Sequence, residues 1–168
     1  MILDRDRAKV YDDFPVQGAM TVMRSRILKT DTEIDTSWAP YGACLLRLAL
    51  STMWLSHAGL KFFTFTLPGF AQFLIDVNLP PFLAWPIFLG ETIGGLAILL
   101  GFYGRQFSLI LLPILAGAAW VHWPNGWDHT SPGGGWEYPV FLIAASLAHA
   151  FIGEGAWALR PSRLFFDT

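Results

Sequence analysis

The sequence has little charge. Only 14% of its 168 residues are Asp, Glu, Lys or Arg, whereas 54% are hydrophobic. Soluble domains carry about 25% charged residues, so a composition this apolar is typical of a polytopic membrane protein. The net charge of -2 identifies no partner, because nearly all the charged residues lie outside the apolar segments.

Cysteine is almost absent. The single residue, Cys44, excludes an intramolecular disulfide, a Cys-x-x-Cys redox pair and a thiolate metal cage. A nucleotide loop is also missing, since Gly133 to Gly135 are followed by no lysine. The chain has no basic stripe, so nucleic acid is not an expected partner. The N-terminus lacks a basic run followed by an apolar core, so we expect the first transmembrane helix to direct insertion.

Four long apolar segments are present, and each is long enough, at about 20 residues, to cross a bilayer. They cover residues 41–62, 81–102, 106–123 and 136–159, and Pro113 is expected to kink the third. Residues 64–80 fit a short interfacial helix. The predicted fold is all-α: a polytopic membrane four-helix bundle over residues 41–159, with a cytoplasmic tail over residues 160–168.

Residues 1–40 form a polar N-terminal arm. Two interpretations stay open for it. Val16, Met20, Met23 and Ile27 could form the apolar face of an amphipathic helix on the bilayer surface. Alternatively, the arm is an extended, solvated tail.

Basic residues predict the orientation. Nine of them fall in the arm, at Arg105 and in the C-terminal tail, whereas the connections on the opposite side have none. The positive-inside bias therefore predicts that both termini are cytoplasmic. Residues 122–139 then face the other compartment.

Two of the predicted spans carry buried charge. Arg47, Trp54 and Lys61 recur at seven-residue spacing, with His57 on the same arc of the helix. Glu91 falls near the centre of the second span, and Arg47 is its expected partner by depth. A structural ion pair between Arg47 and Glu91, a functional proton or ligand site, and a protonated glutamate are the three interpretations.

The connection over residues 122–139 concentrates polar and aromatic side chains between two apolar segments. His57 is near the outer end of the first span, His122 ends the third and Glu137 begins the fourth. These three side chains should reach the same level of the bilayer, so we expect one outer pocket that takes a ring-shaped ligand. An aromatic belt without a ligand is the alternative. The histidines lack metal-ligand spacing, so no metal site is predicted. The candidate ligand-binding residues are His57, Lys61, His122, Trp136, Glu137 and Tyr138.

Several motifs occur in a familiar order. They are Leu-Leu-Arg47, His57-Ala-Gly-Leu-Lys61, Gly90-Glu91-Thr-Ile-Gly94-Gly, Gly104-Arg105, His122-Trp-Pro-Asn-Gly126 and Gly134-Gly-Trp-Glu-Tyr-Pro139. In this combination the chain resembles the DoxX family of four-helix membrane proteins over about residues 41–158.

The resemblance implies a redox-associated subunit of the bacterial cytoplasmic membrane. Members are linked to redox and sulfur metabolism, including the membrane subunit of a thiosulfate:quinone oxidoreductase, so a quinone is a possible ligand. The alternative is a non-catalytic subunit that scaffolds a larger membrane complex. Partners in such a complex, or further copies of the chain, are expected beside the lipid bilayer. No catalytic residue is predicted, and the question of enzyme activity stays open.

Overall fold

The computed structural model describes residues 35–162. The chain divides into two units, Met1–Asp35 and Thr36–Thr168, and the second is described here by itself. Within the described residues the protein is helical, with an isolated bridge between Phe102 and Arg160 and no strand. The all-α prediction is confirmed for this part of the chain. The predicted N-terminal arm lies almost entirely outside it.

The helices overlap the four predicted apolar segments, but the third segment is divided between two helices and the fourth helix ends early. In chain order they are α2 (Ala39–Gly59), the π-helix η1 (Leu60–Thr64), α3 (Leu67–Asp76), the short η2 (Pro81–Leu83), α4 (Ala84–Leu100), α5 (Gly104–Ile110), α6 (Leu112–His122), the short η3 (Trp123–Asn125) and α7 (Glu137–Ile152).

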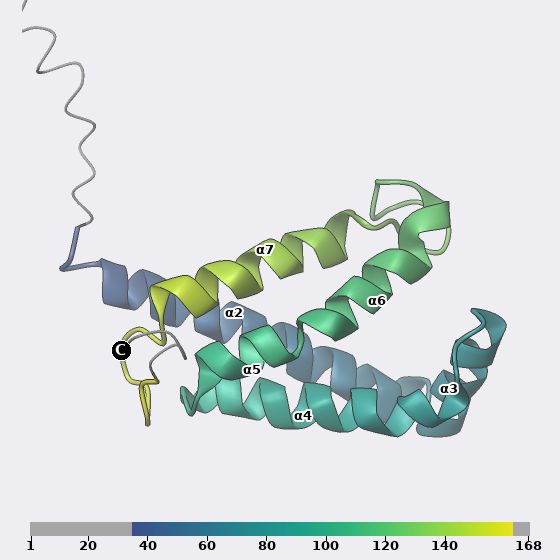
Figure 1. The fold of residues 1–168 in the computed structure, drawn as a ribbon, viewed down its shortest axis with the longest axis horizontal. Helices are drawn as coiled ribbons and strands as arrows, with labels where there is room; N and C mark the ends of the chain where they lie inside the picture. Colours follow the sequence, from purple (N-terminus) through teal and green to yellow (C-terminus); the bar gives the residue numbers. More distant parts are fainter. Residues whose placement is uncertain (1–34, 163–168) are drawn as a thin grey trace, which may run out of the picture. The chain divides into compact units, whose positions relative to one another are not determined.

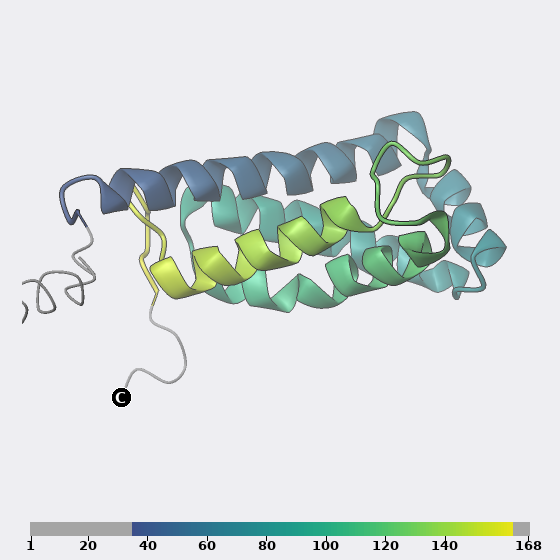
Figure 2. The same cartoon turned by 90° about the horizontal axis from the view of Figure 1, so that it is seen from above.

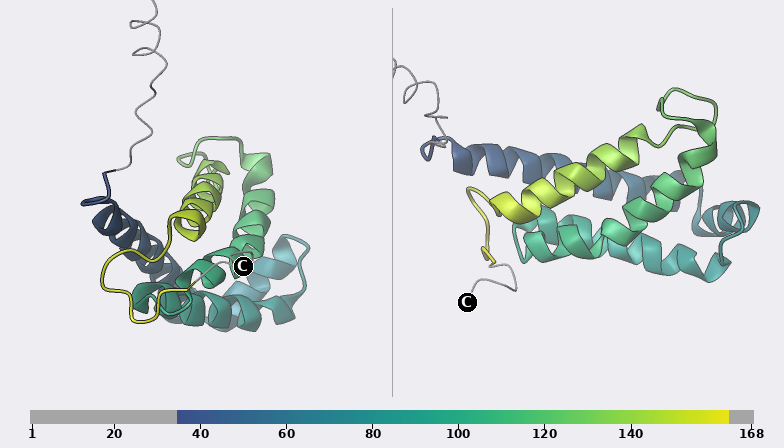
Figure 3. Two further views of the ribbon diagram at one scale, coloured as in Figure 1. Left: turned by 60° about the vertical axis from the view of Figure 1, so that its left-hand side comes forward. Right: turned by 45° about the horizontal axis from the view of Figure 1, so that its top comes forward.

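The long helices run side by side (Figures 1 and 2). Helix α2 packs along α4, and α7 packs against α2, α5 and α6. One end of this unit, called the loop end, holds α3 and residues 123–136. The other, called the tail end, holds the start of α2, the turn between α4 and α5, and residues 153–162 (Figure 3).

Two helical stretches are long and apolar enough to cross a membrane. They are Pro81–Leu100 and Gly104–Asn125. A third candidate is Ala39–Thr64 taken together with Leu67–Asp76, as a broken span or a re-entrant segment. Helix α7 is apolar but shorter. The protein is therefore an integral membrane protein with two or three candidate spans by length and composition.

A sharp bend of 100° separates α2 and η1 from α3. At the bend Thr66 adopts a positive φ of 61°, and its hydroxyl oxygen accepts a hydrogen bond from the Gly69 N–H. Pro68 lies in the first turn of α3, where a missing N–H is least costly. The bend turns α3 across the loop end, as Figure 3 shows. A short helix between the first two apolar segments was expected.

The fourth predicted helix was too long. Residues 136–159 were expected to be helical, but α7 ends at Ile152. Gly153 and Gly155 have positive φ values of 104° and 71°, which favour glycine. A Cβ at Gly155 would also collide with the backbone of Pro40 and Cys44. The chain therefore leaves the helix and folds back over the tail end.

The apolar core lies between the two ends. It consists of Leu50, Trp54, Ile98, Leu111, Leu115 and Leu142. The glycines of α4 let the helices approach, since a Cβ at Gly94 would come within 2.6 Å of the Leu111 side chain. Leu111 also marks the break between α5 and α6, two residues before Pro113, whose missing N–H interrupts the helix. The core separates two groups of buried polar side chains.

Candidate functional site

The loop-end cluster consists of His57, Lys61, Glu91 and Tyr138. At its centre, Lys61 Nζ lies 2.9 Å from both Glu91 Oε1 and Oε2. The Lys61 side chain is 13% exposed and that of Glu91 is 4% exposed. Charges within the hydrocarbon region are costly, so a buried pair of this kind is a candidate for a functional site.

Local structure positions Lys61. It belongs to the π-helix η1, a feature frequent at functional sites. Its Nζ also lies 5.0 Å from the centre of the Phe70 ring of α3, within range of a cation–π interaction. Lys61, which follows α2, therefore contacts both α3 and α4 at the loop end.

His57 and Tyr138 form the aromatic side of this cluster. Their rings stack with centroids 6.3 Å apart and planes 21° from parallel. His57 Nδ1 donates to the Met53 carbonyl over 2.9 Å, which leaves Nε2 as an acceptor when the ring is neutral. His57 also lies within electrostatic range of Glu91. The cluster thus combines an ammonium, a carboxylate, an imidazole and a phenol ring.

The expected pairing of Arg47 with Glu91 was wrong. Helices α2 and α4 are antiparallel, and the Cβ contacts of the α4 glycines show their register. Gly101 lies beside Arg47, and Gly95 lies beside Trp54. Glu91 is one turn further on, which places it level with Lys61. Arg47 lies at the tail end, where its Nη1 donates to the Glu154 carbonyl over 2.9 Å.

Three tryptophans organise the loop over residues 123–136. The Trp136 ring stacks on Trp123, with centroids 4.5 Å apart, and meets Trp127 edge-on at 4.4 Å. Asn125 Nδ2 donates to the carbonyls of Gly133 and Gly134. The turn and glycine signals of the sequence therefore produce an internally bonded loop.

The other predicted ligand residues bond within this loop. His122 Nδ1 donates to the Gly133 carbonyl over 3.0 Å. Glu137 Oε2 accepts from the His129 N–H, and lies 3.3 Å from His129 Nδ1. His57 faces Tyr138 instead. The structure thus brings His57, Lys61 and Tyr138 together with Glu91, while His122 and Glu137 make their hydrogen bonds in the loop.

An exposed group of metal-ligand type lies beside Glu137. The ligand atoms of Asp128, His129 and Glu137 are all within 4.8 Å of one another. The backbone N–H and the hydroxyl of Thr130 both donate to Asp128, which lowers the pKa of that carboxyl. Hydrogen bonds to Thr130 and to the His129 backbone hold the two carboxylates, and exposed acidic groups are common without a metal.

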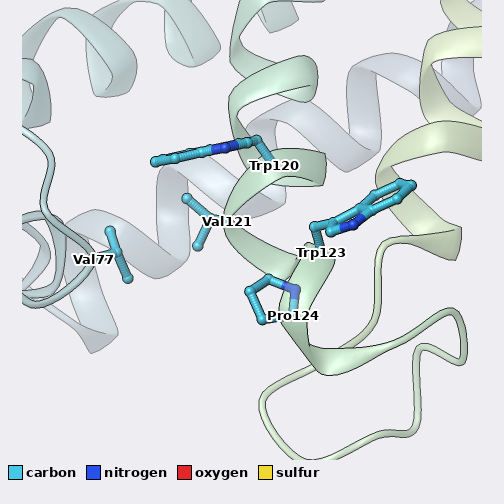
Figure 4. A pocket seen from close by; sticks show the side chains of 5 residues that line it. All are labelled: Val77, Trp120, Val121, Trp123 and Pro124. Atoms are coloured by element: carbon cyan, nitrogen blue, oxygen red, sulfur yellow. The ribbon is translucent and has the colours of Figure 1, made fainter.

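A cavity of about 300 Å³ opens at the same end (Figure 4). It is lined by Val77, Trp120, Val121, Trp123 and Pro124. These residues come from the turn after α3 and from the end of α6 with η3. None was predicted as a ligand residue. The sequence signal was a pair of tryptophans three residues apart at the end of an apolar helix, which is usual in an aromatic belt.

The tail-end cluster consists of Arg47, Arg105, Ser108, His149 and Glu154. Ser108 Oγ lies 2.8 Å from His149 Nδ1, and His149 Nε2 lies 3.7 Å from Glu154 Oε2. Ser108 and His149 are fully buried and Glu154 is 3% exposed. The serine, histidine and glutamate are therefore shielded from solvent, and their contacts join α5, α7 and the segment after α7. Sequence reasoning missed Ser108 and Glu154.

Comparison with known proteins found one family whose model covers three of the four residues of the loop-end cluster. The family model described as DoxX matches residues 42–123. The match includes His57, Lys61 and Glu91, and ends before the tryptophan loop is complete and before α7. No curated protein and no solved structure matches the chain.

Proposed function

Because this chain belongs to the DoxX family of membrane proteins, we propose that it is a redox-associated membrane subunit. Its ligand is a quinone-like or other small ring compound, bound at the loop-end cluster. His122, Trp136 and Glu137 belong to the rim of this site in the proposal. The buried ion pair of Lys61 and Glu91 carries the proposal, because it places a charged donor and acceptor within otherwise apolar helices.

The chemistry of the cluster suits a ring with carbonyl groups. The Lys61 ammonium has three N–H donors, so it can bond to Glu91 and still donate to a ligand oxygen. The stacked rings of His57 and Tyr138 offer flat apolar surface, and Tyr138 is 44% exposed. A quinone-like ring needs both kinds of contact.

The proposed setting is the bacterial cytoplasmic membrane, with four spans and both termini in the cytoplasm. Two observations support this topology. The described chain enters and leaves at the tail end, since the Ala156 N–H donates to the Pro40 carbonyl. In the sequence, nine Lys and Arg residues precede α2, lie in the α4–α5 turn or follow α7, whereas residues 64–83 and 123–136 contain none. Helix α7, at 16 residues, spans about 24 Å.

Cysteine labelling tests this topology. In a Cys44→Ala background, Ser131→Cys should react with an impermeant thiol reagent in intact cells, because the loop faces outward. Thr30→Cys should react only after the cells are opened. The reverse pattern would invert the proposed orientation.

Ligand binding can be measured on protein purified in mild detergent, by mass spectrometry of retained small molecules and by titration with a soluble benzoquinone. We expect Lys61→Met to weaken binding at least about tenfold, because a hydrogen bond from a charged donor is lost. Ile110→Ala is the matched control, since this residue is 63% exposed on α5 and belongs to neither polar cluster. Equal affinity of the Lys61 variant and the parent would contradict the proposal.

A scaffold subunit is the second proposal. It is favoured by the charged arm of about 40 residues, which lies outside the family match over residues 42–123. The same purification distinguishes the two. A partner protein in fixed stoichiometry, with no retained ring compound and no benzoquinone binding, is the result expected of a scaffold.

A further inference from the structure

Helix α3 connects the loop-end cluster with the cavity of Figure 4. Phe70 lies under the Lys61 ammonium, and Val77, directly after the helix, lines the cavity. The two residues are seven positions apart, so they lie on the same face of the helix. The helical rise sets them about 10 Å apart along α3. One molecule of modest length can therefore reach both places.

The cavity differs from the cluster in its chemistry. Valine, proline and tryptophan side chains line it, and the indole N–H groups are its side-chain donors. Trp120 and Trp123 are 62% and 61% exposed, so the cavity is open at the surface of the unit. It lies at the end of the apolar stretch Gly104–Asn125, where a bilayer places acyl chains beside interfacial rings. Its volume of about 300 Å³ is at the low end for ligand sites.

From this juxtaposition we infer that the ligand is an amphiphile: its polar ring occupies the loop-end cluster, and a hydrocarbon chain attached to the ring lies in the cavity lined by Val77, Trp120, Val121, Trp123 and Pro124. The inference rests on the proposed function and adds the class of ligand to it. A water-soluble ring compound would use only the cluster. A compound with an attached hydrocarbon chain would occupy both the loop-end cluster and the cavity, and would enter from the lipid.

The test compares two probes on the full chain in lipid nanodiscs. One is a benzoquinone without a chain, and the other is the same ring with a decyl chain. Val121→Trp fills the cavity, and Ile110→Trp adds the same ring to an exposed position of α5 away from it. Because both variants share one lipid phase, partitioning of the decyl probe affects them equally.

We expect Val121→Trp to weaken binding of the decyl probe about tenfold, because the chain loses buried contact equal to a few methylene groups. Binding of the chainless probe should stay unchanged, and Ile110→Trp should change neither. Lys61→Met should weaken both probes. Equal affinities of Val121→Trp and the parent for the decyl probe would overturn the inference and leave the proposed function standing. Failure of both probes to bind the parent would overturn both.

A second measurement tests the inference without the Val121→Trp variant, in case that variant does not fold. The decyl chain carries a terminal diazirine, and photolabelling of the unmodified protein is mapped by mass spectrometry. Labels on Trp120, Val121 or Val77 that the unlabelled decyl probe displaces are the expected result. Labels spread over the lipid-facing helices would overturn the inference. So would equal labelling by a diazirine phospholipid that the decyl probe does not displace, since the cavity would then hold an ordinary lipid chain.

Discussion

Replacing Glu91 by glutamine is expected to lower the free energy of unfolding by about 3–5 kcal/mol, because it leaves the Lys61 ammonium buried without a counter-charge. The loss is large since the Lys61 side chain is only 13% exposed. Phe70 offers the ammonium a cation–π contact, but this weaker interaction does not replace a carboxylate. Unfolding by sodium dodecyl sulfate titration, followed by helical circular dichroism, measures the change.

The double variant separates the ion pair from general disruption. Lys61→Met alone should cost as much as Glu91→Gln, whereas Lys61→Met with Glu91→Gln should cost less than either, because no unpaired charge remains. Asp76→Asn is the control. Its carboxylate is exposed and bonds to Gln72 on α3, so the change should stay within about 0.5 kcal/mol. If both single variants were as stable as the parent, the ion pair of Lys61 and Glu91 would contribute nothing to the free energy of unfolding.

The predicted charge pair shows what one sequence can and cannot establish. Spacing placed Arg47, Trp54 and Lys61 on one arc of a helix, and Arg47 and Trp54 are indeed buried, at 3% and 1% exposure. Spacing could not say which of the two cations meets Glu91. That depends on how far α2 slides along α4, and the contacts of Gly95 and Gly101 set this register. Depth counted from the segment ends selected Arg47, which lies about four helical turns along the chain from Lys61, the observed partner.

Helix ends and surface cavities were harder to predict than apolar segments. Apolar residues continue from Ala156 to Leu159, so the fourth helix was extended past its end although Gly153 and Gly155 follow Ile152 as a helix-stop signal. The real stop is steric, since Gly155 lies against the backbone of Pro40 and Cys44. The cavity also required contacts between parts of the chain far apart in sequence, the turn after α3 and the end of α6. No local pattern contains such a contact.

The charged residues of the tail-end cluster lie where the C-terminal end of α7 meets the N-terminal end of α5. Arg105 Nε donates to the Ala150 carbonyl over 2.6 Å, and Nη2 donates to the Phe151 carbonyl, at the C-terminal end of α7. In return, Glu154 Oε1 accepts from the Arg105 backbone N–H over 3.0 Å, at the N-terminal end of α5. Each charge lies at the helix end whose dipole it complements. The segment after α7 is thereby fixed across the ends of the neighbouring helices.

Glu154→Ala is therefore expected to cost about 3–5 kcal/mol of unfolding free energy, because a buried carboxylate leaves its partners without an acceptor. These partners are the Arg105 N–H at 3.0 Å and the Ser162 hydroxyl at 2.9 Å. Hydrogen exchange should speed up in residues 153–160. Arg105→Gln should act on the same segment, and the double variant should cost less than the sum of the two.

Loss of the Glu154 carboxylate should not affect the loop-end cluster, which lies on the other side of the apolar core. Glu154→Ala protein that stays folded at low temperature should bind the benzoquinone as the parent does, since Leu50, Trp54 and Leu142 separate this cluster from Lys61 and Glu91. Arg160→Gln is the control for charge. Arg160 is exposed and contacts the Tyr103 ring, so its loss should cost less than about 1 kcal/mol. Unchanged exchange over residues 153–160 in Glu154→Ala would show that the backbone bonds of Ala156 and Leu159 hold the segment without the carboxylate.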